Sequence, residues 1–178
     1  MTSMTRVISL KKLAAGAVLA AVVASSSILA HPAAAQAATV QTKAAQTSAA
    51  SKADRVINLA QSLQSKVRYV WGKNDPSRMV FDCSSFTKYV FKQAAGVDMK
   101  WGANAQYNQF PKVAKANLRP GDLIFASVST PGKIGHVGIY IGNGKMIHNL
   151  NPKNGVVVSD INTGYWKNHY VAAARPIR

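Results

Sequence analysis

The segment from His136 to His148, HVGIYIGNGKMIH, constrains the fold more than any other part of the chain. Apolar residues alternate through HVGIYIG, which predicts a half-buried β-strand. Asn143-Gly144 follows, and this dipeptide favours a two-residue hairpin turn because both of its positions tolerate positive φ. KMIHNL then supplies a partner strand. The pattern predicts an antiparallel hairpin that brings the two histidines near each other across the strands.

Helical patterns precede this hairpin. Between residues 54 and 66 apolar side chains recur at three- and four-residue spacing, which predicts a helix with Asp54 as its N-cap. A second helix is predicted from Asp82, another N-cap candidate, to Gly96, which is typical of a helix C-terminus. Residues 101–110 fit either a short helix or a loop.

Strand patterns dominate the rest of the chain. Besides the hairpin, β-branched or alternating stretches predict strands at residues 122–128, 156–161 and 169–177. Turn signals, Pro120-Gly121 and Asn154-Gly155 among them, separate these stretches. The predicted helices come first, and a largely antiparallel meander follows them. This order indicates the α+β class.

The N-terminal segment has the layout of a secretory signal peptide. A basic start precedes an apolar run at residues 13–30, and Ala35-Gln36-Ala37 supplies the small residues of a cleavage site. A membrane anchor is the alternative, because the run is about long enough to span a bilayer. The cleavage site favours a signal peptide over residues 1–37 and no membrane segment after its removal. A flexible linker is expected at 38–52 and one domain at 53–178.

The charge of the chain indicates an anionic environment. Its 22 Lys and Arg residues face only 6 acidic residues, so the formal net charge is +16. Residues 1–37 hold three of these basic residues and no acid, so the rest of the chain keeps a net charge of +13 out of +16. Export and the lack of a basic helix argue against nucleic acid and favour an anionic polymer of the cell envelope.

Cys83 is the only cysteine, although cysteines of exported proteins usually pair in disulfides. A helix capped by Asp82 would place Cys83 in its first turn, where free N–H groups and the helix dipole favour the nucleophilic thiolate. The same N–H groups could stabilise an oxyanion. From this residue alone, a buried structural cysteine is an equal alternative.

The positions of two of the four histidines favour the interpretation of Cys83 as a nucleophile over that of a structural cysteine. His136 and His148 lie on the paired strands of the hairpin, so one can act as the base and the other can orient it. His31 belongs to the signal region, and His169 is expected to be a surface or structural residue. A zinc site is the rival interpretation, but too few ligands with suitable spacing are present, so no metal is expected.

Five separated blocks resemble the NlpC-type cell-wall cysteine peptidases. The blocks are YVWG at 69–72, DCSSF at 82–86, RPGDLIF at 119–125, the hairpin at 136–148 and YVAAARPI at 170–177. The resemblance covers residues 54–178 and implies a papain-like α+β domain. In such a domain the cysteine opens a helix that packs on an antiparallel sheet carrying the histidines.

The resemblance also implies a role for each matching residue. Cys83 would be the nucleophile, His136 the general base and then acid, and His148 the residue that orients the imidazole. The positions that would contribute to substrate binding are Tyr69, Asp82 and Ser84. Asp82 could both cap the helix and bind an amine of the substrate.

Two positions depart from the family pattern. Ser85 stands where the family usually has glycine, so its side chain would narrow the cleft or change the packing. The segment MKWGANAQYNQF carries Trp101 and lacks the usual arginine, although Gln106 matches a family glutamine. Fine specificity is therefore not predicted by the resemblance.

The activity implied by the resemblance is hydrolysis of amide bonds in peptidoglycan stem peptides, typically the γ-D-glutamyl bond to a diamino acid. It needs no cofactor. An N-acetylmuramoyl-L-alanine amidase with the same residues and a non-catalytic wall-binding protein are the alternatives. We expect a secreted, wall-associated monomer whose partners are peptidoglycan and anionic wall polymers.

Overall fold

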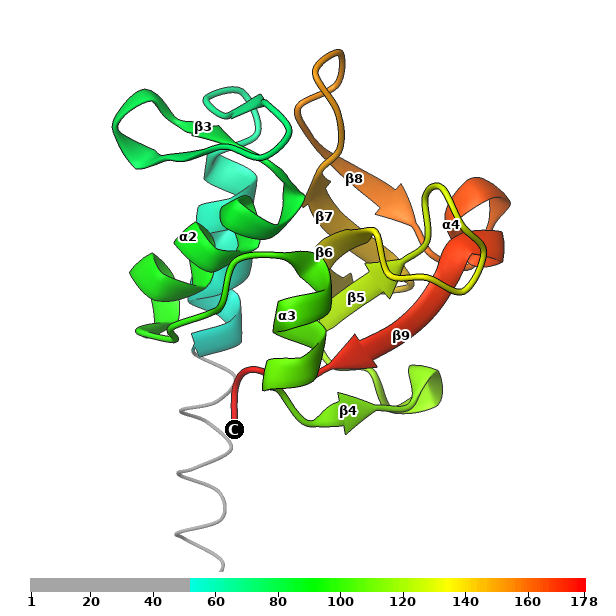
Figure 1. The fold of residues 1–178 in the computed structure, drawn as a ribbon. Coiled ribbons are helices and arrows are strands. Elements are labelled where there is room, and N and C mark those ends of the chain that lie inside the picture. The colour runs from blue at the N-terminus through cyan, green and yellow to red at the C-terminus, as the bar shows by residue number, and fades with distance from the viewer. Residues whose placement is uncertain (1–51) are drawn as a thin grey trace, which may run out of the picture.

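A six-stranded antiparallel sheet forms the centre of the structure, a computed structural model that describes residues 52–178 (Figure 1). Its strand order is β4-β9-β5-β6-β7-β8. The strands are β4 (Lys112–Val113), β5 (Leu123–Ala126), β6 (His136–Gly142), β7 (Lys145–Asn149), β8 (Val156–Asp160) and β9 (Tyr170–Ala174). The α+β class is confirmed, and β5 to β8 form the predicted meander. The last strand, β9, does not continue this meander but returns to pair with β5.

The predicted hairpin and its turn at Asn143-Gly144 are confirmed. Asn143 and Gly144 have φ angles of 51° and 69°, as a turn with two left-handed residues requires. Ile139 of β6 lies opposite Ile147 of β7. The register shifts by one residue near the turn, where a bulge follows Tyr140. Beyond the bulge the pairing is regular and sets the positions of both histidines.

The predicted second helix, α2 (Cys83–Ala95), has the expected ends. Asp82 is its N-cap, and Gly96 ends it with a left-handed φ of 69°. Residues 103–109 form the short helix α3 (Ala103–Gln109), which settles the open choice for residues 101–110. A fourth helix, α4 (Gly164–His169), was not expected, because its six residues are too few to show a helical period.

The boundaries predicted for the first helix were wrong at both ends. Residues 52–62 are helical, so Asp54 lies inside the helix rather than at its N-cap. The packing of Ala53 against the loop at Gly121 extends the helix toward the N-terminus. At the other end the Ser62 hydroxyl donates to the Leu59 carbonyl, which competes with helical bonding and favours the tight turns that follow.

A second, small sheet precedes α2. It contains β1 (Arg68–Tyr69), β2 (Asn74–Asp75) and β3 (Val80–Phe81), with β3 in the middle. The first pair is parallel and the second antiparallel. A 3-10 turn at Pro76–Arg78 joins β2 to β3, and another at Lys115–Asn117 follows β4. Because β3 ends one residue before the N-cap of α2, this sheet fixes where the helix begins.

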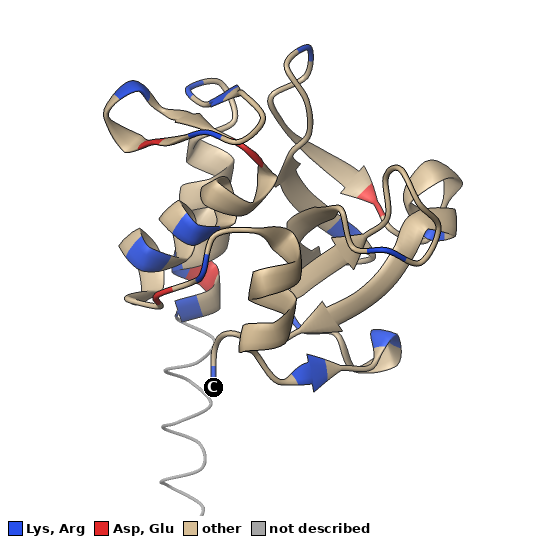
Figure 2. Ribbon diagram, in the orientation of Figure 1, with Lys and Arg blue, Asp and Glu red and all other residues tan. Residues whose placement is uncertain are grey.

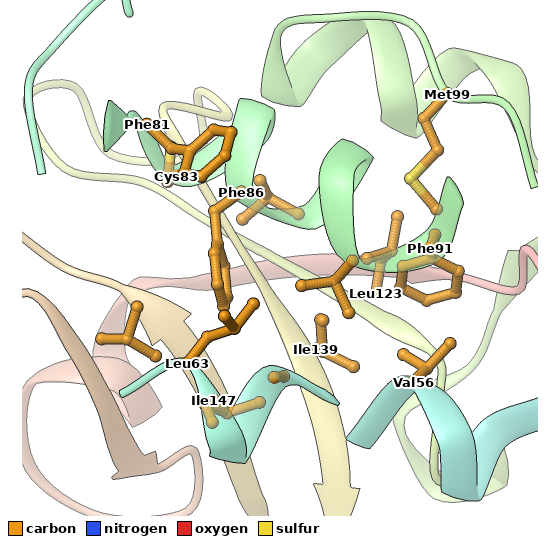
Figure 3. Close-up of a cluster of buried hydrophobic side chains, with 14 of the residues drawn as sticks. Val56, Leu63, Phe81, Cys83, Phe86, Phe91, Met99, Leu123, Ile139 and Ile147 are labelled. Carbon is orange, nitrogen blue, oxygen red and sulfur yellow. The ribbon is translucent and has the colours of Figure 1, made fainter. Parts of the chain in front are cut away.

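The main core lies between the helices and one face of the large sheet. Phe86, Val90 and Phe91 of α2 pack with Ile139 and Ile147 of the hairpin (Figure 3). These five side chains are fully buried. Burial of a large apolar side chain contributes about 2 kcal/mol, so this contact holds the start of α2 against the hairpin.

A smaller core covers other residues of the sheet. Ile124, Met146, Ile161 and Ala173 form it, with Trp166 of α4 packed against them. Met146 neighbours Ile147 in β7, so the two cores lie on opposite faces of the strand. The large sheet is thus covered on both faces at the hairpin.

The expected signal peptide and nearly all of the expected linker lie outside the described residues. Within residues 52–178 no helix combines the length and apolarity needed to cross a membrane.

Candidate active site

The start of α2 is held by a cap in which side chains bond in both directions. Oδ1 of Asp82 accepts the backbone N–H groups of Ser84 at 2.9 Å and Ser85 at 2.7 Å, and the Ser84 hydroxyl at 2.8 Å. The Ser85 hydroxyl accepts the N–H of Asp82 at 2.9 Å, which completes a capping box. Cys83 is the first helical residue, and the Asp82 side chain accepts from the two residues after it but not from the N–H of Cys83 itself.

The suggestion that Ser85 narrows the cleft was wrong. Its side chain is fully buried and does not line the cavity described below. Besides accepting from Asp82, its hydroxyl donates to the Lys73 carbonyl at 2.6 Å. Ser85 therefore ties the start of α2 to the loop before β2, which is the packing effect that was the other possibility for this position.

The two predicted histidines meet across the hairpin. Nε2 of His136 lies 2.8 Å from Nδ1 of His148, and their ring planes are nearly perpendicular, at 85°. Both side chains are buried, with 4% and 0% exposed. A Cβ on Gly138 would lie 3.0 Å from both Cβ of His148 and Sδ of Met146. The absence of a side chain at Gly138 therefore leaves room for the close approach of His148 and Met146 to β6.

Trp166 covers the histidine pair. Its ring stacks on His136 with 5.2 Å between centroids and lies edge-on to His148 at 4.9 Å. The indole keeps bulk water away from the bond between the imidazoles, which strengthens that bond in a low local dielectric. Sequence patterns did not identify Trp166, although the aromatic pair Tyr165-Trp166 after a glycine was a visible signal.

Asn149 joins the two halves of the site. Its side-chain amide donates to the Phe81 carbonyl at 2.9 Å, and the residue is fully buried. Phe81 is two residues before Cys83, and Asn149 directly follows His148. This hydrogen bond therefore fixes the distance between the strand that leads to the cysteine and the strand that carries the second histidine.

A cavity of about 530 Å³ opens at the start of α2. Five of the six predicted site residues line it: Tyr69, Asp82, Cys83, Ser84 and His136. The sixth, His148, lies behind His136 and does not line the cavity, which fits the orienting role expected for it. Trp71, with 84% of its surface exposed, and Trp101, with 47%, form aromatic walls.

Trp101 is connected to the cap of α2. Its Nε1 donates to Oδ2 of Asp82 at 2.8 Å, so both carboxylate oxygens already have partners. Gln106, the predicted match to a family glutamine, is fully buried. Its amide donates to the Ser84 carbonyl at 2.7 Å and to the Lys100 carbonyl at 3.0 Å. These bonds hold the loop that carries Trp101 against the start of α2.

Burial determines the protonation of the site. It raises the pKa of the Cys83 thiol to about 12, with the Asp82 charge acting in the same direction, although nearby N–H groups of Val137 and Ser84 oppose it. Burial lowers the pKa of His136 to about 4. The N–H groups at the helix start favour the thiolate as predicted, but the loss of water outweighs them, so the net pKa is raised. We therefore expect a protonated thiol and a neutral imidazole in the resting site.

A comparison with known protein families identifies the family of this chain. The profile of the NlpC/P60 family matches residues 66–175, which is more than half of the chain. The chain belongs to the NlpC/P60 family. The matched region includes both sheets, α2 and all six predicted site residues.

Relatives of this NlpC/P60 chain include longer proteins that are named as an endopeptidase and a hydrolase. It is 41% identical over 107 residues to the probable endopeptidase p60 of Listeria seeligeri, covering 60% of this chain and 19% of that protein. It is 38% identical over 96 residues to the gamma-DL-glutamyl hydrolase of Bacillus subtilis, covering 53% of this chain and 22% of that protein. The chain thus spans about a fifth of the length of these curated relatives.

A crystal structure of an NlpC/P60 family protein from Bacillus cereus has the same fold. The TM-score is 0.63 at 31% sequence identity, over 71% of this chain and 40% of that one. The similarity confirms the predicted arrangement of helices followed by a mostly antiparallel sheet. Within residues 52–178 no three His, Cys, Asp or Glu side chains are grouped as a metal site would need.

The buried histidines of this NlpC/P60 domain predict a loss of stability in acid. Burial lowers the pKa of His136 to about 4 and that of His148 to about 3, from the ordinary value of 6.5. Between about pH 6.5 and pH 4 the unfolded chain binds more protons than the folded one, so the free energy of unfolding falls as the pH is lowered. His136 alone accounts for about 3 kcal/mol.

Urea unfolding at pH 7.5, 6, 5 and 4 checks this prediction. His148→Gln removes one of the two buried imidazoles and is expected to flatten the pH dependence. His169→Gln, on α4 and outside the cavity, is the matched control and should leave it unchanged. An identical pH dependence in wild type and His148→Gln would contradict the prediction.

Proposed function

We propose that this domain is a cysteine peptidase that hydrolyses the stem peptides of peptidoglycan, at the bond from γ-D-glutamate to a diamino acid. The observation that carries the proposal is that Cys83 and His136 line the same cavity, with His148 hydrogen-bonded to His136 from behind. Family membership and the names of the relatives, endopeptidase and gamma-DL-glutamyl hydrolase, support the substrate class.

In the proposed first step the neutral thiol gives its proton to His136 as it attacks. Nε2 of His136 is engaged by His148, so Nδ1 is the nitrogen available to the thiol. Sγ of Cys83 bonds to the carbonyl carbon, and the carbonyl oxygen becomes an oxyanion. The free N–H of Cys83 is a donor for this oxyanion, because Asp82 occupies those of Ser84 and Ser85.

The second half of the reaction returns the site to its resting state. His136 donates the proton to the leaving amine, the C–N bond breaks and a thioester remains on Cys83. Water then gives a proton to His136 and attacks the thioester, and the C–S bond breaks with return of a proton to sulfur. His148 keeps the His136 ring oriented throughout, and Trp166 excludes other water from the pair.

A defined muropeptide distinguishes the proposed endopeptidase from an amidase. Mass spectrometry of an endopeptidase digest would show a dipeptide stub on the sugar and a released peptide that begins with the diamino acid. An amidase would release the whole stem peptide. A non-catalytic wall-binding protein would give neither product, and this result would overturn the proposal.

Asp82 is also proposed to bind a free amine of the substrate, since its carboxylate lines the cavity. Asp82→Asn keeps an oxygen for the cap but removes the charge. We expect KM for a peptide with a free amino terminus to rise about tenfold or more, and KM for its acetylated form to stay the same. Trp101→Phe is the comparison variant: it removes the donor to Oδ2 and leaves the charge, and because it also alters an aromatic wall of the cavity, any change in KM should be the same for the free and the acetylated peptide. Unchanged KM for the free amine, at equal stability, would refute this role.

Attachment to the wall is proposed to rest on positive charge. Lys and Arg occur on helices, strands and loops, with few acidic positions among them (Figure 2). Asp82 and Asp122 are buried, with 7% and 1% exposed, and Asp122 is paired with Arg175. The exposed lysines are therefore weakly opposed, as retention on teichoic acids and other anionic polymers requires. Together with the signal peptide expected at residues 1–37, this charge supports the proposal of an exported, wall-associated protein.

Salt should release the protein from isolated walls. Screening shortens the Debye length from about 14 Å at 0.05 M to about 4 Å at 0.5 M salt, so we expect most bound protein to elute over this range. The triple variant Lys133→Gln, Lys145→Gln, Lys153→Gln should elute at lower salt and still hydrolyse a small soluble substrate, because these exposed residues do not line the cavity. Retention that resists salt in both proteins would contradict the role of charge.

A further inference from the structure

Ser159 extends the histidine pair by one more hydrogen bond. Its Oγ lies 2.9 Å from Nε2 of His148, whose Nδ1 faces His136. In the register of β7 and β8, Met146 lies opposite Ser159 and Val157 opposite His148, so the serine and the histidine are diagonal neighbours on one face. Strands β6, β7 and β8 are neighbours in the large sheet (Figure 1). The two hydrogen bonds therefore link His136, His148 and Ser159 across these three strands.

The two hydrogen bonds couple the tautomers of the two rings. A neutral imidazole donates from one nitrogen and accepts at the other. If Ser159 accepts Nε2–H of His148, then Nδ1 of His148 accepts Nε2–H of His136, and Nδ1 of His136 keeps a free lone pair. If Ser159 donates instead, every bond reverses and Nδ1 of His136 carries a proton. Only the first arrangement lets His136 take the proton of the thiol.

We propose that Ser159 is a positioning residue whose hydroxyl accepts from His148, holds it in the Nε2–H tautomer and keeps Nδ1 of His136 available as the base. Ser159 is partly exposed, so its own proton can go to water while its lone pair faces His148. His148 is fully buried, and within residues 52–178 its Nε2 has no hydrogen-bond partner besides Ser159. Loss of the hydroxyl therefore leaves this N–H unpaired and removes the preference for the competent tautomer.

The proton balance of the reaction fits this role. The thiol proton moves to Nδ1 of His136, and the resulting imidazolium still donates its Nε2–H to His148. No proton passes to His148 or Ser159, and the transferred proton leaves with the amine. Ser159 thus acts through His148 and does not touch the reacting atoms. The inference rests on the proposed function, but its direct test does not require turnover.

Long-range ¹H–¹⁵N spectra of the histidine side chains in the full-length protein, at pH 7.5, report the tautomers directly. We expect Nε2–H for both His136 and His148 in the wild type. Ser159→Ala should populate Nδ1–H in His148 and lower kcat/KM roughly tenfold to a hundredfold, the usual range for a residue that orients another. Ser159→Thr keeps a hydroxyl and should restore both readouts. Val158→Thr, at an exposed position of the same strand, is the matched control.

The outcomes separate this inference from the proposed function. A wild-type spectrum with Nδ1–H in His148 overturns the inference, and it decides the matter even if Ser159→Ala does not fold. Unchanged tautomers and unchanged kcat/KM in a folded Ser159→Ala also overturn it. The expected tautomers and their shift in Ser159→Ala, seen in a wild type that hydrolyses no muropeptide, support the inference while the proposed function fails.

Discussion

Replacing Cys83 by serine is expected to lower kcat/KM for a stem-peptide substrate by at least about a thousandfold, as loss of a nucleophile does in other hydrolases. In the proposed mechanism the thiol depends on His136 to remove its proton, and a hydroxyl holds its proton far more tightly and is a weaker nucleophile. The rate of release of the diamino-acid peptide, measured at several substrate concentrations, gives the ratio.

The stability of the variant shows whether the loss is chemical. Cys83 is only 8% exposed, and serine has nearly the same shape and suits the first turn of a helix. The free energy of unfolding of Cys83→Ser should stay within about 1 kcal/mol of the wild type. Activity within tenfold of the wild type in a folded Cys83→Ser would exclude this cysteine as the nucleophile.

Replacing His136 by glutamine is expected to lower kcat/KM by about a hundredfold to ten-thousandfold, the range for loss of a general base. The glutamine amide can still donate to Nδ1 of His148, so the buried partner keeps a hydrogen bond. The loss should appear mainly in kcat, because in the proposed mechanism the ring accepts and returns protons rather than holding the ground-state substrate.

A histidine outside the cavity gives the control for this second prediction. His169 lies on α4, stacks on Tyr165 with 3.7 Å between centroids and bonds the Tyr165 carbonyl. His169→Gln should keep kcat/KM within about twofold of the wild type, because surface changes away from a site have small effects. Equal losses in both variants would mean that His136 has no special part in the chemistry.

Local signals predicted the parts of the fold that depend on neighbouring residues. Asn143-Gly144 determined the turn, and Asp82 with Gly96 determined the ends of α2, since each acts through its own backbone. The predicted hairpin was then sufficient to predict that His136 and His148 lie close together. The short strands of the small sheet and the helix α4 escaped prediction because long-range packing, rather than their own sequence, stabilises them.

The chemistry of the site was less predictable than its residues. The helix start suggested a thiolate, but burial of Cys83 depends on residues that are distant in sequence, and burial outweighs the local effect. The contact of Ser159 with His148 depends on the register of β8, and the cover by Trp166 depends on the path of the chain after that strand. No periodicity or motif in the sequence predicts any of these three features.

Digestion of purified walls of known chemistry tests the central claim, that Cys83 of this domain cleaves stem peptides. Wild type and Cys83→Ala are incubated at equal concentration, and the soluble products are identified by mass over time. We predict that the wild type releases peptides beginning with the diamino acid and leaves a dipeptide on the sugar, whereas folded Cys83→Ala releases none above the level without enzyme. Equal release by the two proteins would contradict the account.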